Sequence, residues 1–237
     1  MERPTWLVYE NQHILAVNKP ANLPSQPLSV DETRTMVGMV IAVYPQLRGV
    51  GDKPLEAGLL NRLDIKTSGL LLFAKDEKTY QEYFKLQKAG QVRKIYDAVV
   101  MGKVEQPGEI KLPLKATGPR GMKMKVDPKR GSLKAKTRYW PEKILHDKTL
   151  LRVEITQGAR HQIRCHLAFL GHPVLGDELY GQVIEGAKSF DFYFLHAAEV
   201  HFPKGWLQIP GDKVVVPYPR EWDFNLLRHR ECQRGWH

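Results

Sequence analysis

Residues 61–76 read NRLDIKTSGLLLFAKD. The first half is polar and ends in a glycine, and the second half begins with LLLFA (70–74), an apolar run typical of a buried β-strand. Because a buried strand follows directly, we expect the backbone around Asp64 to be rigid. A carboxylate held rigidly at the entrance of a strand can act as a nucleophile or a general base. A turn aspartate that only caps nearby N–H groups would give the same pattern, so both interpretations stay open for this stretch alone.

Periodicity on either side of this stretch predicts the remaining elements. Strands are predicted at 13–20, 70–74, 93–104, 134–140, 149–156, 194–202 and 212–217. Helices are predicted within 35–44, 76–90 and 157–171. Strands outnumber helices and do not alternate regularly with them. The expected fold class is therefore α+β, with a mixed, largely antiparallel sheet and flanking helices.

The composition limits the class of protein. The chain has 237 residues, of which 42% are hydrophobic and 26% charged, as in a globular protein with one large domain or two small ones. No apolar run approaches the roughly 20 residues that span a bilayer, and the N-terminus lacks the pattern of a signal peptide. Two cysteines, Cys165 and Cys232, are too few for a disulfide framework. These features predict a cytoplasmic protein with no membrane partner.

The net charge of +10 is concentrated in one segment. Residues 111–138 hold ten Lys or Arg and one acidic residue, Asp127, so this segment alone carries +9. Such a density indicates a polyanionic partner, and nucleic acid is favoured because the segment lacks the apolar face of a membrane-binding helix. The alternative is a solvated loop without a partner.

The predicted strand 93–104 carries a second candidate for chemistry. Lys94 and Tyr96 are two residues apart, so their side chains point to the same face of the strand. A neighbouring ammonium favours the phenolate and would lower the pKa of the tyrosine, which could also stack on a base. An ordinary half-buried aromatic residue is the alternative.

A third candidate is the start of the helix predicted within 157–171. Arg160 and Arg164 are four residues apart there, and cations at a helix N-terminus oppose the helix dipole by about a few tenths of a kcal/mol each. We therefore expect an anionic partner nearby. His161, Cys165 and His166 could suggest a metal, but no second pair of ligands has matching spacing, so we predict no metal site.

In five ordered blocks the chain resembles the RluA family of pseudouridine synthases, from about residue 7 to residue 217. The resemblance implies the pseudouridine synthase fold with a central RNA-binding cleft. It also predicts a stand-alone catalytic domain at 1–220 and a C-terminal tail at 221–237, without the small N-terminal RNA-binding module of some relatives. The blocks are NKPANLPSQP (18–27), NRLDIKTSGLLLFAK (61–75), VRKIYDAVVMG (92–102), GARHQIRCHLAFLGHPVLGDELYG (158–181) and FLHAAEVHFP (194–203).

The resemblance implies an isomerase that converts uridine in RNA to pseudouridine. The bond from C1 of the sugar to N1 of the base breaks, the uracil rotates, and C1 bonds to C5. No cofactor, metal or obligate protein partner is expected, and the RNA is tRNA or rRNA. Asp64 matches the family's catalytic aspartate, and Tyr96 and Arg164 match its active-site tyrosine and arginine. Further RNA contacts are predicted for Arg62, which would enter the RNA stack as the target base flips out, and for Lys94, Lys123, Lys125, Arg160, His161 and Gln162.

We expect Arg164 to pair with Asp64 and keep it ionised. One position departs from the family pattern, because Asn61 replaces the usual histidine before Arg-Leu-Asp. We interpret this change as altering loop hydrogen bonds or substrate fit, with activity kept. Two other functions stay open: a base-removing glycosylase, which would release free uracil, and an RNA-binding protein of the same fold with impaired catalysis. The intact Asp64 argues against the second.

Overall fold

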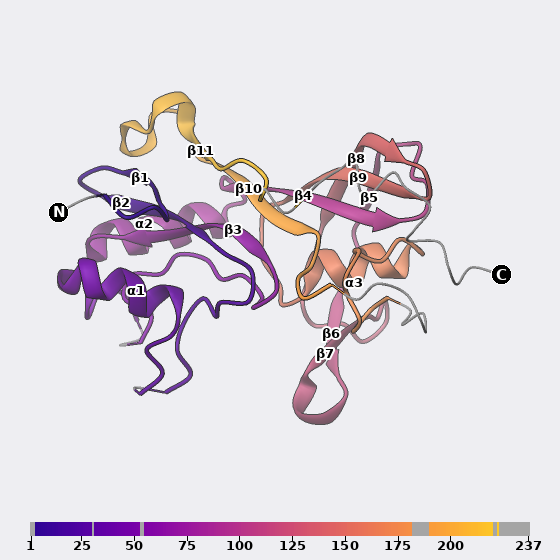
Figure 1. The fold of residues 1–237 in the computed structure, drawn as a ribbon, viewed down its shortest axis with the longest axis horizontal. Coiled ribbons are helices and arrows are strands. Elements are labelled where there is room, and N and C mark those ends of the chain that lie inside the picture. Colours follow the sequence, from indigo (N-terminus) through magenta and orange to yellow (C-terminus); the bar gives the residue numbers. More distant parts are fainter. Residues whose placement is uncertain (1–2, 30, 53–54, 182–189, 220–221, 223–237) are drawn as a thin grey trace. The chain divides into compact units, whose positions relative to one another are not determined.

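The computed structural model describes residues 3–29, 31–52, 55–181, 190–219 and 222 (Figure 1). The chain divides into two compact units, Met1–Lys94 with Ala197–Pro217, and Ile95–His196 with Tyr218–His237. The predicted tail at 221–237 lies outside the described residues apart from Trp222. The boundary predicted at residue 220 and the central cleft stay predictions.

The first unit is built on antiparallel strand pairs. Strand β2 (Ile14–Lys19) pairs with β1 (Leu7–Glu10) on one side and with β3 (Ser68–Ala74) on the other. Strand β11 (Lys213–Val215) pairs with β10 (Leu195–His201). Every residue of β3 is buried, as the LLLFA run predicts.

Gly69, in the polar half of the opening stretch, allows β3 to approach its neighbour closely. Its φ is +114°, and a Cβ at this position would lie 2.4 Å from the carbonyl oxygen of Ala197 in β10. A side chain would therefore push the two backbones apart, so the motif needs glycine here.

Two helices pack in this unit and begin where the sequence predicts. In α1 (Met36–Val43) the Thr35 side chain caps the N-terminus by accepting from Gly38 N–H, and in α2 (Glu77–Lys88) Asp76 does the same for Thr79 N–H. Helix α2 buries Tyr80 and Tyr83 against the apolar side chains of β2 and β3. Short 3₁₀ turns follow at Pro45–Leu47, Trp206–Gln208 and Pro210–Asp212.

Strands of the second unit follow one another in the order β4 (Arg93–Met101), β9 (Lys148–Ile155), β8 (Thr137–Leu145) and β5 (Gly108–Ile110). Strand β8 pairs antiparallel with β9 and with β5. Strand β4 passes from the first unit into the second. Strand β8 is longer than predicted, because the register shifts between Pro141 and Lys143 and lets the strand continue past a residue without an N–H.

The basic segment contains a hairpin that periodicity did not predict. Strands β6 (Leu114–Thr117) and β7 (Lys123–Val126) form a separate two-stranded antiparallel sheet, joined through a 3₁₀ turn at Pro119–Gly121. Helix α3 (Gln162–Phe169) contacts β7 and β8. Leu114 and Met124 of the hairpin and Cys165 of α3 share one small apolar core. The segment is therefore partly folded onto α3 and is not only a loop.

The prediction of an α+β fold with a mixed, largely antiparallel sheet and flanking helices is confirmed. In the described part of the chain, no helix is long and apolar enough to cross a membrane.

Candidate active site

Asp64 lies in the first unit, in a tight turn immediately before β3. The turn closes through a hydrogen bond from Thr67 N–H to the Asp64 carbonyl (3.0 Å). The Asp64 side chain is half-buried, and Arg62 is exposed. Three sets of contacts hold this turn, from Asn61, from Asn22 and Ser25, and from Lys19.

The Asn61 side chain pins the start of the turn to β3. Its Nδ2 donates to the Leu70 carbonyl (3.0 Å), and its Oδ1 accepts from Leu72 N–H (2.9 Å). A side-chain amide carries a donor and an acceptor next to each other, so it can imitate the backbone of a neighbouring strand. This geometry supports the interpretation that position 61 acts through loop hydrogen bonds.

Residues 18–27 hold the turn from another direction. The buried hydroxyl of Ser25 donates to the Leu63 carbonyl (2.8 Å) and accepts from Leu63 N–H (3.0 Å). Asn22 N–H donates to the Ile65 carbonyl (2.8 Å). Two sequence blocks far apart in the chain therefore meet at Asp64, and the backbone on both sides of this residue is fixed.

Lys19 lies fully buried near the same turn. Its ammonium donates to the carbonyls of Pro20 (2.8 Å), Leu23 (2.8 Å) and Ile65 (3.1 Å). Burial lowers the pKa of Lys19 to about 7, and the negative charge of Asp64 opposes that shift. The three carbonyl acceptors also favour the charged form. Sequence reasoning missed this residue, although a lysine that ends an apolar strand was visible in ILAVNK.

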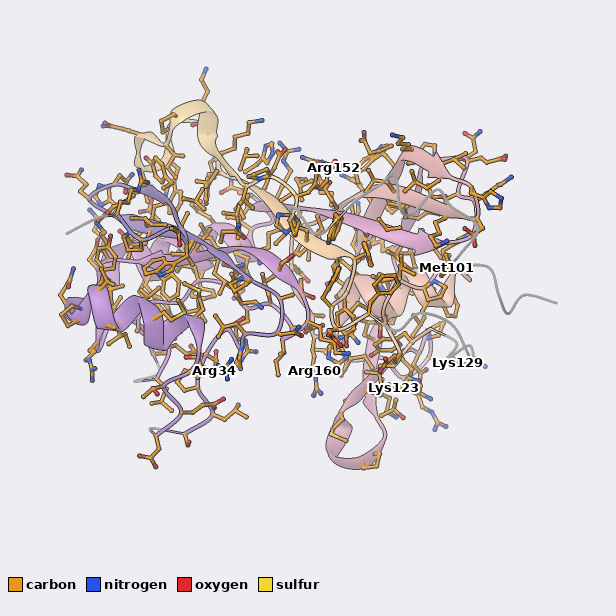
Figure 2. All side chains as sticks on the ribbon, in the orientation of Figure 1. Arg34, Met101, Lys123, Lys129, Arg152 and Arg160 are labelled. Atoms are coloured by element: carbon orange, nitrogen blue, oxygen red, sulfur yellow. The ribbon has the colours of Figure 1, made fainter. Side chains whose placement is uncertain are left out.

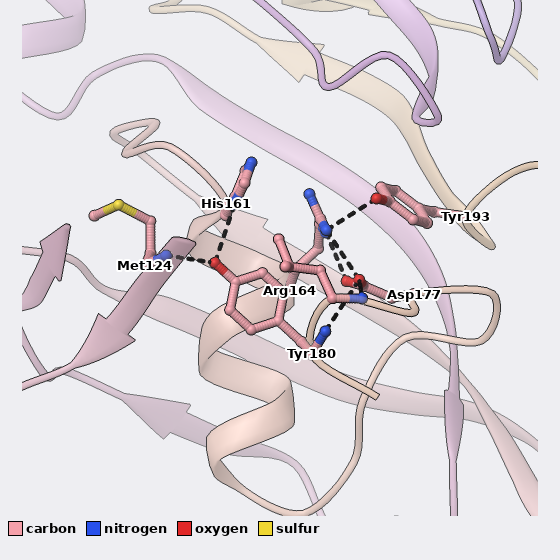
Figure 3. A network of polar contacts seen from close by, with 7 residues as sticks. Met124, His161, Arg164, Asp177, Tyr180 and Tyr193 are labelled. Carbon is pink, nitrogen blue, oxygen red and sulfur yellow. Dashed lines mark hydrogen bonds and ion pairs between the residues drawn. The ribbon is translucent and has the colours of Figure 1, made fainter. Parts of the chain in front are cut away.

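Arg164 lies in the second unit, on α3, and is buried (Figure 3). Its Nε donates to Asp177 Oδ2 (2.6 Å), and its Nη2 donates to Asp177 Oδ1 (2.9 Å) and to the Tyr193 hydroxyl (3.0 Å). The guanidinium carbon is 4.1 Å from the ring centroid of Tyr193 and 5.1 Å from that of Tyr180. The predicted pairing of Arg164 with Asp64 stays a prediction.

Tyr180 connects this arginine to the basic hairpin. Its hydroxyl accepts from Met124 N–H (2.7 Å) in β7 and lies 3.0 Å from His161 Nδ1 (Figure 3). Burial raises the pKa of Tyr180 to about 12, so the phenol stays protonated at neutral pH. The Tyr180 hydroxyl therefore joins β7 to the residue directly before α3.

Arg160 does not belong to the first turn of α3, contrary to the prediction. His161 takes a left-handed φ of 53°, and the helix begins only at Gln162. Arg160 instead donates to the carbonyls of Gly121 (3.0 Å) and Met122 (2.7 Å), and so ties the hairpin turn to the residues before α3.

Gln162 and His166 have partners inside the protein. The buried Gln162 side chain accepts from Ala159 N–H (3.1 Å) and donates to the Lys136 carbonyl (2.9 Å). His166 is bonded to the Thr137 hydroxyl and the Leu112 carbonyl, and burial lowers its pKa. Among the described residues, no group of three His, Cys, Asp or Glu could hold a metal ion.

Lys94 and Tyr96 of β4 are both buried. The Lys94 ammonium donates to Gln87 Oε1 (3.0 Å) on α2, and burial lowers the pKa of Lys94 to about 8. Lys94 therefore contacts a protein amide, and the structure adds no support for its predicted RNA contact. The predicted effect of Lys94 on the Tyr96 hydroxyl stays a prediction.

The basic residues of 111–138 differ in their partners within the protein. Lys136 and Arg138 form ion pairs with Glu109 (2.9 and 2.8 Å). Lys123 lies 5.3 Å above the Tyr180 ring, and Lys125 is 3.7 Å from Asp127. Around the hairpin the cationic side chains of Lys123, Lys125, Lys129 and Arg130 are exposed, and Figure 2 labels the first and third of these.

Several of the predicted residues form two groups, each within one unit. Arg62 and Asp64 lie on the turn before β3, whereas His161, Arg164 and Lys123 contact Tyr180, and Arg160 binds the hairpin turn. Sequence reasoning missed Asp177, Tyr180 and Tyr193 as partners of Arg164, although the first two were visible in the block VLGDELYG.

Comparisons with known proteins agree with the resemblance to the RluA family. A model of the RNA pseudouridylate synthase family matches residues 13–169. The chain is 35% identical to the dual-specificity RNA pseudouridine synthase RluA of Vibrio cholerae serotype O1, covering 96% of this chain and 89% of that protein. It is 32% identical to the ribosomal large subunit pseudouridine synthase D of Pseudomonas aeruginosa, covering 94% and 71%.

Among solved structures, the fold is similar to that of human RNA pseudouridylate synthase domain containing 4, with a TM-score of 0.70 and 23% identity over 94% of this chain and 92% of that one. The family match covers more than half of the chain, and the curated relatives share about a third of its residues over nearly its whole length. The chain therefore belongs to the RluA family of RNA pseudouridine synthases.

Proposed function

We propose that this RNA pseudouridine synthase acts on uridines of tRNA or rRNA and that Asp64 is its catalytic residue. The observation that carries the proposal is the anchoring of the Asp64 turn by Asn61, Ser25 and Lys19. A turn that merely connects two elements would not need hydrogen bonds from residues 19–25 as well as from Asn61. A carboxylate whose backbone is fixed in this way is preorganised for chemistry at one place.

Each proposed residue has a task that suits its side chain. The Asp64 carboxylate attacks the sugar or removes its proton, and the Tyr96 ring stacks on the flipped uracil and accepts the C5 proton through its oxygen. Arg164 donates N–H groups that orient the reacting groups in the active site. The exposed Arg62 enters the RNA stack, which offsets part of the few kcal/mol that base flipping costs.

The basic hairpin suits an RNA backbone. Four exposed cations surround β6 and β7, and phosphate contacts of this kind position an RNA without reading its sequence. The Vibrio relative is named a dual-specificity enzyme and the Pseudomonas relative a ribosomal large subunit enzyme. We therefore propose structured RNA as the substrate, with tRNA and rRNA as the two candidates, and the cytoplasm as the place of the reaction.

The test is to map pseudouridine in total RNA from cells with and without this protein, and then to repeat the reaction with purified protein and RNA labelled with tritium at C5 of uridine. We expect sites that depend on the protein, and tritium release that Asp64→Ala abolishes. Formation of free uracil would identify a glycosylase instead. RNA binding without either product would identify a protein with impaired catalysis.

A further inference from the structure

Asp177 and Arg164 form a buried ion pair within the network of polar contacts drawn in Figure 3. The two side chains are 0% and 3% exposed. A buried guanidinium is strongly unfavourable unless a carboxylate compensates its charge and accepts its N–H groups. Asp177 does both, since its two oxygens each accept from a different nitrogen of Arg164 (2.6 and 2.9 Å).

This two-bond contact fixes the plane of the guanidinium. Two parallel N–H···O bonds prevent rotation about the last bond of the side chain, and the group itself is planar. The Tyr193 hydroxyl accepts a further bond from Nη2 (3.0 Å), and the Tyr193 ring lies 4.1 Å from the guanidinium carbon. The direction of Nη1 then follows from the planarity of the group.

The carboxylate is held independently of Arg164. Its Oδ1 also accepts from Leu179 N–H (3.1 Å) and Tyr180 N–H (3.3 Å), and the turn closes through Gly181 N–H to the Asp177 carbonyl (2.8 Å). The backbone of residues 177–181 therefore fixes Asp177, and Asp177 in turn fixes Arg164.

We propose that Asp177 is a positioning residue, which orients the Arg164 guanidinium for the uridine isomerisation. This inference rests on the proposed function, because it takes Arg164 to be part of the active site. The Asp177–Arg164 pair is neutral as a whole, so Arg164 contributes a directed N–H more than a net charge. A directed donor loses much of its effect when it tilts, since catalysis requires donors aimed at the reacting atoms.

One substitution can replace Asp177 Oδ2 and still leave an acceptor oxygen at Oδ1. Oδ1 accepts the backbone N–H groups of the turn and Arg164 Nη2, and Oδ2 accepts Arg164 Nε. Asp177→Asn keeps an Oδ1 for the turn and replaces Oδ2 by an amide that faces Nε donor to donor. The variant therefore keeps the fold of the turn and misaligns Arg164.

Glu154→Gln is the matched control. Glu154 lies in the same unit, is buried, and pairs with Arg138 Nη1 (3.3 Å), so this change also removes one carboxylate charge opposite an arginine. Both variants raise the net charge by the same amount, and any general effect of charge on RNA affinity is the same for both.

In steady-state reactions with C5-tritiated RNA, we expect Asp177→Asn to lower kcat by about 30-fold or more, with KM, RNA affinity and the unfolding temperature close to those of Glu154→Gln. The double variant with Arg164→Lys tests whether Asp177 acts through Arg164. In that background, Asp177→Asn should lower kcat by less than about threefold.

The outcomes separate this inference from the proposed function. If the wild-type protein forms no pseudouridine, the proposed function fails. If the wild type is active and Asp177→Asn has the same kcat, or loses the same factor in both backgrounds, Asp177 does not position Arg164. If Arg164→Lys has no measurable turnover, the effect of Asp177→Asn alone tests the inference. A loss in kcat with unchanged KM supports it, and a loss confined to KM contradicts it.

A second variant covers the case in which Asp177→Asn does not fold. Tyr193→Phe keeps the ring and removes one bond to Nη2, so we expect a smaller loss of kcat, of about threefold to tenfold, with KM unchanged. A loss confined to KM would contradict the inference.

Discussion

The Lys19 ammonium donates to the carbonyl of Ile65, the residue directly after Asp64, at a distance of 3.1 Å. The two residues are 46 positions apart in the chain. Two more carbonyls, those of Pro20 and Leu23, accept from the same ammonium, so one buried cation joins the end of β2 to the turn of the candidate active site.

Replacing Lys19 should loosen this turn. Lys19→Met keeps the length of the side chain and leaves three carbonyls without their donor, so we expect the free energy of unfolding to fall by about 2–4 kcal/mol. Denaturant unfolding measures this change, and kcat should fall with it. Lys75→Met, at an exposed ion pair with Glu10, is the control and should change stability by less than about 1 kcal/mol. Equal stability of the two variants would contradict the anchoring role.

Lys19 also predicts a dependence of stability on pH. Its pKa is about 7 in the folded protein and near 10.5 in the unfolded chain, so between these values the unfolded state binds more protons. The cost of burying the charge of Lys19 is therefore absent above about pH 10.5 and grows as the pH falls to about 7. We expect the stability of wild type relative to Lys19→Met to rise from pH 7 to 9, by at most about 1.4 kcal/mol per pH unit. A flat difference would show that the carbonyls keep Lys19 charged.

Asn61 should matter through its two hydrogen bonds to β3. Asn61→Ala removes both, and we expect unfolding to become easier by about 1–3 kcal/mol. Asn61→Asp keeps the acceptor for Leu72 N–H and places a second oxygen opposite the Leu70 carbonyl, so it separates the two bonds. Asn61→His restores the residue usual in the family, and turnover should stay within about tenfold of wild type. A hundredfold gain would mean that the natural protein is catalytically impaired.

The role of the Tyr96 hydroxyl can be tested by removing it. Tyr96→Phe keeps the ring and removes the hydroxyl, so a residue that accepts the C5 proton should lose turnover by at least about a hundredfold while RNA affinity is retained. Rates of tritium release and a binding titration measure the two quantities. Near-normal turnover would leave Tyr96 with a stacking role only.

The exposed cations of the hairpin should set the dependence of binding on salt. Replacing Lys123, Lys125, Lys129 and Arg130 with Ser should weaken binding of any RNA and flatten the plot of log K against log salt by roughly 0.7 to 0.9 per lost contact. Turnover at saturating RNA should fall much less, because phosphate contacts perform no bond chemistry. A control variant of Lys136 and Arg138, whose cations are paired with Glu109, should change the slope less per lost cation. Superimposable slopes for wild type and the quadruple variant would exclude the hairpin from RNA binding.

The sequence by itself determined the local elements of this protein and its family. Apolar runs predicted β2, β3, β4 and β9, and periodicity placed α1 and α2, because these signals depend on neighbours within a few positions. The blocks around Asp64 and Arg164 were recognisable for the same reason, since they are contiguous. The hairpin β6–β7 was missed because its two strands have only four residues each and lie among charged side chains.

Only the tertiary structure decided which groups the polar side chains bind. The RNA contacts of Arg160 and Gln162 stay predictions, whereas the structure shows that Arg160 binds the hairpin turn and that Gln162 binds the Lys136 carbonyl just before β8. The partners of Lys19 and of Arg164 lie on other segments of the chain, and no spacing in the sequence encodes them. A buried polar group must find a partner, but it takes whichever donor or acceptor the packed chain brings within about 3 Å, and that choice is made by the fold as a whole.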